Sequence, residues 1–268
     1  MHTLAIDRVN TPTEQPVTAT AVLEVRDLVL QYKTWEHLVT ATWNVSFDVH
    51  KGERFILLGP SGCGKSSILK AVGGFVPAAS GTMKLNGQLI NGPAPDRIMV
   101  FQEFEQLLPW KTVLENVIFP MKTTKRFPAN ELVARARSVI DKVGLSRFVD
   151  AYPHTLSGGM KMRVAIARAL AMEPEVLLMD EPFAALDALT RKKMQEELLT
   201  LWDQTNFTMM FVTHSIEEAI VLGSRILVLS AHPGRVRAEL NSGEFAFNDI
   251  DNPGFGALQR RINDMLFH

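Results

Sequence analysis

Several features that mark other classes of protein are scarce or missing in this sequence. Its 268 residues include a single cysteine, Cys63, so no disulfide can form within the chain, which suits a reducing compartment. Lysine and arginine total 28 against 29 aspartate and glutamate, so no basic excess points to nucleic acid, although a local basic face stays open. No apolar run approaches the roughly 18 residues of a membrane span, and the N-terminus has no charged-then-apolar signal pattern. We therefore expect any link to a membrane to go through a partner protein.

Apolar side chains, in contrast, are plentiful. They make up 46% of the residues, enough for one large domain or a domain with a small subdomain. Short apolar runs alternate with helical patterns, which predicts an α/β fold with a mostly parallel sheet and a ligand site at the carboxyl ends of its strands. We expect strands over residues 22–30, 45–49, 54–58, 82–85, 88–90, 97–101, 176–179, 207–212 and 225–229. We expect helices over residues 67–72, 188–202, 215–222 and 258–266, and another that ends near residue 171.

The pattern also divides the chain into regions. Residues 1–20 are rich in Thr, Pro and Ala without periodicity, which is typical of a disordered leader. Residues 21–240 form the main domain. Within it, the charged stretch 111–150 is mainly helical, stops at Gly144 and interrupts the alternation, so we expect an inserted helical subdomain over about 104–172. Residues 241–268 are a C-terminal extension whose role the sequence does not indicate.

The most informative motif fits the phosphate-loop pattern G-x-x-x-x-G-K-[ST] between a predicted strand and a predicted helix. Glycines there let backbone N–H groups turn inward around an anion, and the helix N-terminus adds positive charge. The Lys65 side chain would reach the β- and γ-phosphates, and the Ser66 hydroxyl would ligate Mg²⁺. A glycine-rich turn that binds nothing is the alternative. The Cys63 thiol is either a reactive group that nucleotide would protect or an unremarkable small residue. The residues of this loop and the helix start are Gly59, Pro60, Ser61, Gly62, Cys63, Gly64, Lys65, Ser66 and Ser67.

Two carboxylates end the apolar run 176–179. Asp180 is placed to hold Mg²⁺ opposite Ser66, and Glu181 to orient or deprotonate an attacking water. Two solvated acids at a strand end are the alternative, which the phosphate loop disfavours. His214 also follows a predicted strand and is either a hydrogen-bond donor to a γ-phosphate or a structural histidine. Gln102, after the strand that ends at residue 101, could contact Mg²⁺ or water.

A second anion site is indicated by Ser157, Gly158 and Gly159, which precede a helix. Ser157 is a plausible N-cap, and the glycines leave backbone N–H groups open at the positive helix end. A fold with one bound nucleotide has no evident use for such a second site. An ordinary capped helix is the alternative.

Together these motifs resemble the ATP-binding subunits of ABC transporters over roughly residues 22–240. Six segments carry the resemblance by order and spacing: GPSGCGKS at 59–66, VFQ at 100–102, LSGGM at 156–160, VLLMDEP at 176–182, AALD at 184–187 and VTH at 212–214. The resemblance implies a P-loop NTPase fold with an N-terminal antiparallel β subdomain and an inserted α-helical subdomain. It also implies ATP and Mg²⁺ as ligands.

The resemblance further implies a role for individual residues. An aromatic between the first two strands stacks on adenine, and either Tyr32 or Trp35 fits, because the loop from 31 to 43 looks longer than usual. Ser157 and Gly159 would bind the γ-phosphate of ATP held by the other protomer of a head-to-tail dimer, which explains the second anion site. The remaining roles are Q-loop glutamine for Gln102, D-loop aspartate for Asp187 and switch histidine for His214.

Leu107-Leu108-Pro109-Trp110 and the LSGGM form of the signature resemble the nitrate/sulfonate/taurine importer branch. That branch implies a peripheral protein on the cytoplasmic face of the bacterial inner membrane. Its partners would be permease subunits and, through them, an extracytoplasmic solute-binding protein, with no nucleic acid expected. The dimer would be a homodimer or a pair with a sister ATPase. The chain departs from the branch by one extra residue between Gln102 and Leu107, by Met162 where Gln is frequent and by Ser215 where Asp is frequent. These departures leave the solute open.

The leading hypothesis is therefore an ATP hydrolase that drives import of a small anionic or polar solute. One alternative is a soluble ABC ATPase acting on nucleic acid or the ribosome, but duplicated cassettes, long coiled coils and cysteine-rich modules are missing. Another is a small-molecule phosphotransferase, which would not need the LSGGM helix. A third is an exporter subunit, against which the LLPW segment argues.

Overall fold

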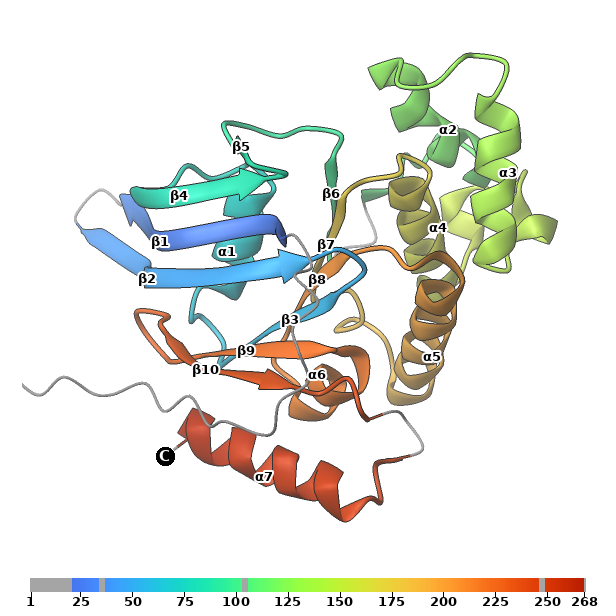
Figure 1. Cartoon of the computed structure of the whole chain (residues 1–268). Coiled ribbons are helices and arrows are strands. Elements are labelled where there is room, and N and C mark those ends of the chain that lie inside the picture. Colours follow the sequence, from blue (N-terminus) through green and yellow to red (C-terminus); the bar gives the residue numbers. More distant parts are fainter. Residues whose placement is uncertain (1–20, 34–36, 103–105, 246–248, 268) are drawn as a thin grey trace, which may run out of the picture.

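The computed structural model describes residues 21–33, 37–102, 106–245 and 249–267, so the expected leader, residues 1–20, lies outside it. Two sheets organise these residues (Figure 1). The antiparallel sheet has the order β2-β1-β4-β5 and contains β1 (Ala21–Lys33), β2 (Leu38–His50), β4 (Ser80–Leu85) and β5 (Gln88–Leu89). The larger sheet has the order β10-β9-β3-β8-β7-β6. Its strands are β3 (Arg54–Leu58), β6 (Arg97–Val100), β7 (Val176–Asp180), β8 (Met209–Thr213), β9 (Arg225–Leu229) and β10 (Val236–Asn241).

The larger sheet is parallel except at one edge. Strand β3 pairs in parallel with β8 and β9, β7 pairs in parallel with β6 and β8, and only β10 runs antiparallel to its neighbour. The expected α/β class, with a mostly parallel central sheet and an antiparallel N-terminal sheet, is confirmed. The expected hairpin is present too, since Leu85 pairs with Gln88 and both turn residues, Asn86 and Gly87, have positive φ.

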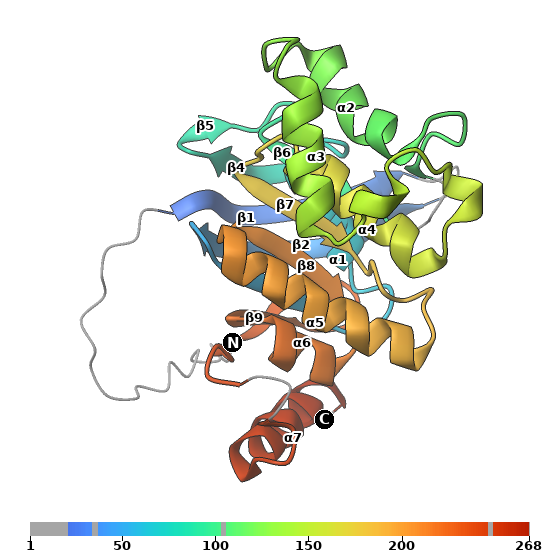
Figure 2. The same cartoon turned by 90° about the vertical axis from the view of Figure 1, so that its right-hand side faces the viewer.

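Helices cover both faces of the larger sheet. The helices are α1 (Lys65–Val72), α2 (Val113–Thr124), α3 (Leu132–Lys142), α4 (Gly158–Leu170), α5 (Ala188–Thr205), α6 (Ile216–Leu222) and α7 (Pro253–Phe267). Helices α2, α3 and α4 contact one another and form a separate block beside the sheet, which Figure 2 shows from the side. Helix α3 ends at Lys142, just before Gly144 with its φ of +68°, as the sequence predicts.

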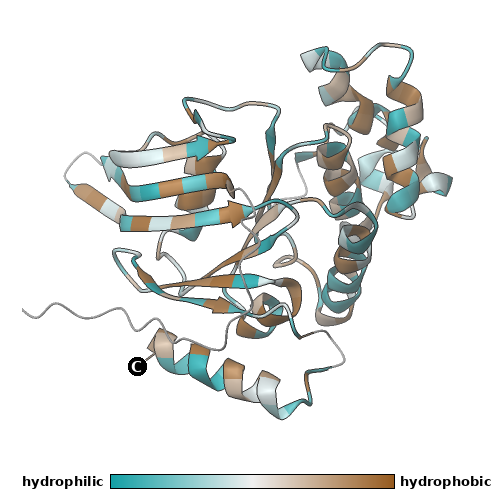
Figure 3. Cartoon of the chain, in the orientation of Figure 1, coloured by the Kyte–Doolittle hydropathy of each residue, from teal (hydrophilic) through white to brown (hydrophobic). Residues whose placement is uncertain are grey.

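The core has two parts because the central strands are apolar on both faces. Ile56 and Leu58 of β3 join the cluster under α4, α5 and α6, while Phe55 and Leu57 join the cluster between α1 and the antiparallel sheet. Figure 3 shows the apolar residues concentrated on these strands, whereas α5 mixes apolar and polar residues. Within the described residues, no helix has the length and apolar content needed to cross a bilayer.

The first hairpin corrects one expectation. The sequence predicts a loop over residues 31–43 with Tyr32 between two strands, but β1 continues to Lys33 and β2 starts at Leu38, so Tyr32 lies within β1 and pairs with Val39. Backbone pairing extends a hairpin past its apolar part without help from buried side chains. Trp35, the rival adenine-stacking residue, lies outside the described residues.

The C-terminal part is built into the core. Strand β10 adds an edge to the larger sheet, so the boundary expected at residue 240 falls inside it. Helix α7 is longer than the predicted 258–266 and contacts α6 and β9, where it buries Phe255 and Ile262. Arg237 of β10 also donates to the carbonyl oxygen of Met265 in α7.

Candidate active site

The phosphate loop joins β3 to α1, and its glycines are required by close approach of the chain. Gly64 has φ +93°, and a Cβ there would come within 2.5 Å of Cγ2 of Thr42 and 2.9 Å of the carbonyl oxygen of Ala41. Gly62 also has a positive φ, +79°. A side chain at either position would strain the backbone. The loop therefore presents backbone rather than side chains at the N-terminus of α1, which is the geometry that binds an anion.

Lys65 is held at the centre of this loop. Its ammonium nitrogen Nζ lies 2.8 Å from the carbonyl oxygen of Gly59 and 3.0 Å from that of Pro60, and the side chain is buried. The side chain thus folds over the loop and places a positive charge there. A phosphate entering the cradle would meet this charge and the N-terminal N–H groups of α1 together.

The two residues expected to hold Mg²⁺ at this point are in contact. The Ser66 hydroxyl donates to Oδ1 of Asp180 at 2.7 Å, which joins the first turn of α1 to the end of β7. Burial raises the pKa of Asp180, while the hydrogen bond from Ser66 and the charge of Lys70 oppose the rise. A hydroxyl and a carboxylate beside a phosphate cradle are the hard oxygen donors that Mg²⁺ prefers, so the residues fit the ion. Gln102, the third residue expected there, is exposed beyond the end of β6.

Glu181 and His214 form the second contact at this sheet edge. Nδ1 of His214 lies 2.9 Å from Oε2 of Glu181, which brings together residues that follow the neighbouring strands β7 and β8. The Glu181 side chain is 22% exposed and that of His214 is 57% exposed, so the pair faces solvent from the histidine side. Glu181 has φ +44°, a strained conformation for a residue with a side chain, and its N–H donates to the carbonyl oxygen of Val212 at 3.2 Å.

A polar cluster that the sequence analysis missed lies behind this pair. Glu218 of α6 accepts hydrogen bonds from Thr213 and Gln195, and together with Arg191, Glu181 and His214 it lines a cavity of about 60 Å³. Ser215 and Glu218 match the S-x-x-E pattern of a capping box, which was the available signal. Half of that box is present, since Ser215 Oγ accepts from the N–H of Glu218 at 3.3 Å, but the Glu218 carboxylate bonds to other elements instead.

Two further predicted residues lie next to the loop. The Tyr32 hydroxyl donates to Oγ of Ser67 at 2.9 Å, so the half-exposed ring of Tyr32 lies over the first turn of α1. Cys63 is fully buried, and a Cβ on Gly59 would come within 2.7 Å of its sulfur. Burial raises the pKa of the Cys63 thiol. The geometry favours the unremarkable small residue over the reactive thiol.

The residues of the predicted second anion site lie at helix N-termini on other elements. Ser157 caps α4 by accepting from the N–H of Met160 at 3.3 Å, as predicted, and Asp187 caps α5 by accepting from the N–H of Thr190 at 3.0 Å. The latter hydrogen bond lowers the pKa of Asp187. Gly159 faces α5, where a Cβ would lie 3.3 Å from Cγ2 of Thr190. Among the described residues, no hydrogen bond joins Ser157 or Asp187 to the phosphate loop.

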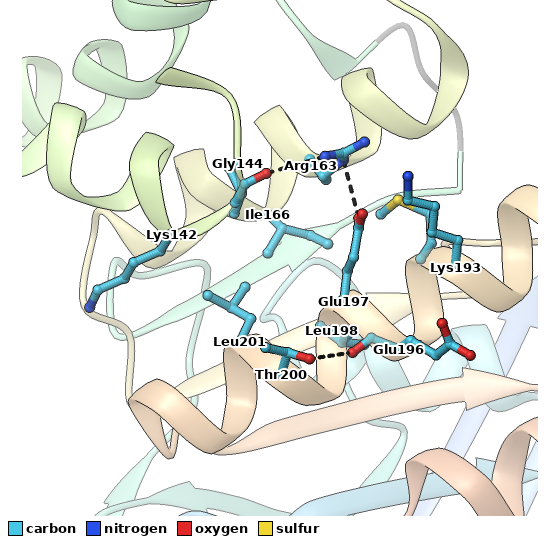
Figure 4. Close-up of a pocket in the computed structure, with 12 residues that line it drawn as sticks. Lys142, Gly144, Arg163, Ile166, Lys193, Glu196, Glu197, Leu198, Thr200 and Leu201 are labelled. Atoms are coloured by element: carbon cyan, nitrogen blue, oxygen red, sulfur yellow. Dashed lines mark hydrogen bonds and ion pairs between the residues drawn. The ribbon is translucent and has the colours of Figure 1, made fainter. Parts of the chain in front are cut away.

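A larger cavity of about 390 Å³ separates the helical block from α5 (Figure 4). It is lined by residues of α3, α4 and α5, among them Ile166, Lys193 and Leu201. Nε of Arg163 in α4 lies 3.3 Å from Oε2 of Glu197 in α5, and this ion pair crosses the cavity wall. This pair links α4, the helix that carries Gly158 and Gly159, to α5 beside the cavity.

Comparison with protein families and known proteins finds ATP-binding proteins of ABC transporters. The model of a family described as ABC transporter matches residues 42–184. The taurine import ATP-binding protein TauB of Rhizobium johnstonii is 49% identical over 76% of this chain and 77% of the relative. The nitrate import ATP-binding protein NrtD of Synechocystis sp. is 43% identical over 81% of each chain. The bicarbonate transport ATP-binding protein CmpD of the same organism is 41% identical over 96% of this chain and 93% of the relative.

Solved structures agree with the fold. The dimeric ATP-binding cassette MJ0796, in a post-hydrolysis state bound to ADP and Pi, has a TM-score of 0.70 and 33% identity over 82% of this chain and 98% of its own. CbiO1 from Clostridium perfringens, part of the ABC transporter complex cbiONQ, has a TM-score of 0.75 and 27% identity over 91% of this chain and 98% of its own.

Proposed function

The chain belongs to the ABC transporter family, in the branch of nitrate, sulfonate and taurine importers, and from this membership we propose that it is the ATP-hydrolysing subunit of an importer for a small anionic or polar solute. The observation that carries the proposal is the pairing of Ser66 with Asp180 and of Glu181 with His214 at the carboxyl edge of one parallel sheet. Residues 21–240 serve as the ATPase domain, with about 104–172 as its helical subdomain.

The phosphate loop binds the nucleotide, and the pair of Ser66 and Asp180 holds its metal. Lys65 and the loop N–H groups bind the β- and γ-phosphates of ATP, and the Tyr32 ring, fixed to Ser67, stacks on adenine. Ser66 and Asp180 would hold Mg²⁺, with Gln102 joining as the site closes. When bound, Mg²⁺ neutralises charge on the β- and γ-phosphates.

The second pair performs the hydrolysis step. Glu181 accepts a proton from a water whose oxygen attacks the γ-phosphorus, and the bond from that phosphorus to the β–γ bridging oxygen breaks. The products are ADP and inorganic phosphate. His214 orients the Glu181 carboxylate through its Nδ1 contact and hydrogen-bonds the γ-phosphate with the exposed part of its ring.

Ser157, Gly158, Gly159 and Asp187 complete the site of a second protomer. Because Ser157 and Asp187 lie on helix N-termini away from their own phosphate loop, a head-to-tail dimer lets each protomer's helices meet the ATP of the other. The related cassette MJ0796 is dimeric with ADP and Pi bound. A homodimer, or a pair with a sister ATPase, satisfies this arrangement.

Exposed aromatic side chains supply the contact with the permease. Phe75 and Phe101 have ring centroids 6.3 Å apart, and Trp110 is 70% exposed in the segment that leads into α2. We call Phe75, Phe101 and Trp110 the exposed aromatics. Aromatic side chains are enriched at protein interfaces, which suits contact with an apolar partner helix. The protein would then sit on the cytoplasmic face of the bacterial inner membrane, with a solute-binding protein acting through the permease. Relatives named for taurine, nitrate and bicarbonate point to a small anionic or polar solute.

The test is affinity purification of the full chain from its native membranes in mild detergent, with the co-purifying proteins identified by mass spectrometry. We expect a multi-span permease in near-stoichiometric amount. A preparation that contains only soluble proteins or nucleic acid would contradict the importer role while leaving the ATPase assignment standing. The binding protein encoded with that permease would then be screened against taurine, nitrate and bicarbonate.

A further inference from the structure

Glu218 connects two elements of the active-site edge that the hydrolysis step must keep in register. Its carboxylate accepts from Nε2 of Gln195 in α5 at 2.7 Å through Oε1, and from the Thr213 hydroxyl at the end of β8 through Oε2. Each carboxylate oxygen therefore serves a different element. Among the described residues, no hydrogen bond joins Glu218 to the phosphate loop or to Asp180.

The Thr213 side of this network fixes the turn that carries His214. The Thr213 hydroxyl donates to Glu218 and accepts from the N–H of Ser215 at 3.0 Å, while Ser215 Oγ accepts from the N–H of Glu218 at 3.3 Å. These three hydrogen bonds join Thr213, Ser215 and Glu218 in a closed network. His214 lies between Thr213 and Ser215 but takes no part in that network. The backbone of the turn is therefore held on both sides of His214, whose imidazole contacts Glu181.

The Gln195 side reaches the start of α5. Asp187 caps that helix, and one turn further Arg191 donates from Nη2 to the carbonyl oxygen of Leu186 at 3.0 Å. Nε of Arg191 is buried without a hydrogen-bond partner among the described residues, and Arg191 lines the same 60 Å³ cavity as Glu181, His214 and Glu218. A cavity of this size with polar walls has room for water between these groups.

The surroundings of Glu218 act on its carboxyl group in opposite directions. Burial raises the pKa of Glu218, while the hydrogen bonds from Thr213 and Gln195 and the charges of Arg191 and His214 oppose the rise. A part-buried polar group that is hydrogen-bonded through both of its oxygens is rigidly held, so it keeps the two groups it joins in a fixed relation.

We propose that Glu218 is a positioning residue for ATP hydrolysis, which holds the turn of His214 against Glu181 and ties that turn to α5, the helix capped by Asp187. The inference rests on the proposed roles of Glu181 and His214 in hydrolysis. In the proposed head-to-tail dimer Asp187 belongs to the partner's site, so a link from its helix to His214 would make closure at one position set the geometry at the other. Misplacement of a reacting group by about 1 Å is enough to cost about a hundredfold in rate.

The experiment measures steady-state ATPase activity of the purified full chain with its KM for ATP. Glu218→Ala should lower kcat about tenfold or more and leave KM within about twofold, because Lys65 and Tyr32 do not depend on the link. Glu218→Gln should recover part of the loss, since its amide oxygen still accepts from Gln195. Glu217→Ala, on the same turn but exposed, is the matched control and should match wild type.

A double-mutant cycle separates the link from general structural damage. Gln195→Ala should lower kcat, and in the Glu218→Ala background it should add nothing, because the link is already cut. Unchanged kcat in Glu218→Ala, or full additivity of the two changes, would overturn the inference. Should Glu218→Ala fail to fold, Glu218→Gln and Gln195→Ala are decisive: wild-type kcat in both overturns it.

ATPase activity of Glu181→Gln, measured in the same assay, distinguishes failure of the Glu218 proposal from failure of the proposed hydrolysis roles. Loss of turnover in Glu181→Gln with wild-type rates in Glu218→Ala removes only the positioning role. Normal turnover in Glu181→Gln removes the proposed hydrolysis roles themselves, whatever Glu218→Ala does.

Discussion

Glu181 has an unfavourable backbone conformation that nevertheless places its carboxylate against His214. Its φ of +44° costs about 1–3 kcal/mol for a side chain of this size, yet this turn is what aims its carboxylate at His214 rather than along β7 beside Asp180. Two adjacent carboxylates are thereby sent to different tasks: Asp180 contacts Ser66, and Glu181 contacts His214. We propose that this strain helps to keep the two proposed roles, metal binding by Asp180 and water activation by Glu181, on separate side chains.

Replacement of Glu181 by glutamine tests that separation. Glu181→Gln should preserve ATP binding, because Lys65, Ser66 and Tyr32 are untouched, and should nearly abolish turnover, since removal of a general base costs about 10²–10⁴-fold. Because its ATP is not hydrolysed, the variant should accumulate as a dimer, detected by size-exclusion chromatography. Lys65→Ala, which loses the phosphate contact, is the control that should stay monomeric. Normal turnover in Glu181→Gln would refute the assignment.

Alkylation of Cys63 tests the burial of the loop interior. Burial raises the pKa of this thiol, and only the thiolate reacts, so at every pH below the raised pKa the reactive fraction is smaller than for a free cysteine. Iodoacetamide labelling followed by mass spectrometry should be at least about tenfold slower at pH 8 in the native protein than in urea, and its rise with pH should lie at a more alkaline value. Fast labelling of native protein at pH 7 would instead favour the reactive thiol.

The sequence predicts site residues well where a motif dictates a contact and poorly where contacts join distant elements. Ser66 and Asp180 are predicted as partners because each belongs to a recognisable pattern, and they lie 2.7 Å apart. Glu218 is not predicted, because S-x-x-E indicates only a local cap. Its actual partner Gln195 is 23 positions away on another helix, and only the packing of α5 against α6 brings the two together.

At the scale of elements, the positions of buried strands can be predicted from the sequence, whereas those of edge strands cannot. Strand β3 has Phe55, Leu57 and their neighbours buried on both faces, so its apolar run is unambiguous. Strand β10 (Val236–Asn241) is mostly exposed and polar, and backbone pairing with β9 rather than side-chain burial holds it. The extension of β1 and β2 around Tyr32 has the same origin, which is why a loop was expected there.

Helix α7 contributes to the stability of the ATPase fold. Phe255 is 1% exposed and meets Phe245 edge-to-face at 5.8 Å, so Phe255→Ala should lower the free energy of unfolding by about 3–5 kcal/mol. The matched control is Phe267→Ala in the same helix, whose side chain is 65% exposed and whose loss should change stability by less than about 0.5 kcal/mol. Urea unfolding followed by circular dichroism measures both. Equal effects would mean that α7 is only loosely attached.

At the scale of the whole molecule, the functional parts are divided between two bodies. The phosphate loop, Glu181 and His214 belong to the sheet, whereas Ser157 and Gly159 belong to the helical block, which meets α5 across the cavity with the Arg163–Glu197 pair. Apolar residues of α2, α3 and α4 share one buried cluster with β3, β7 and α5, so the helical block is tied to the sheet by a common core. Trp110 stands on the segment that leads from the sheet into this block, so a partner bound there would lie at the junction of the two bodies.

We propose that the permease binds at Trp110, and substitution of its side chain tests the exposed aromatics. Trp110→Asp should reduce permease recovery in the affinity purification by about tenfold or more, because a charge replaces a large exposed apolar side chain at the core of the contact. Leu89→Asp is the matched control: Leu89 is 56% exposed, but on β5 of the antiparallel sheet, and should retain the permease. Circular dichroism of both variants checks the fold. Equal permease recovery from the two would place the docking surface elsewhere, and loss from Leu89→Asp alone would move it to the antiparallel sheet.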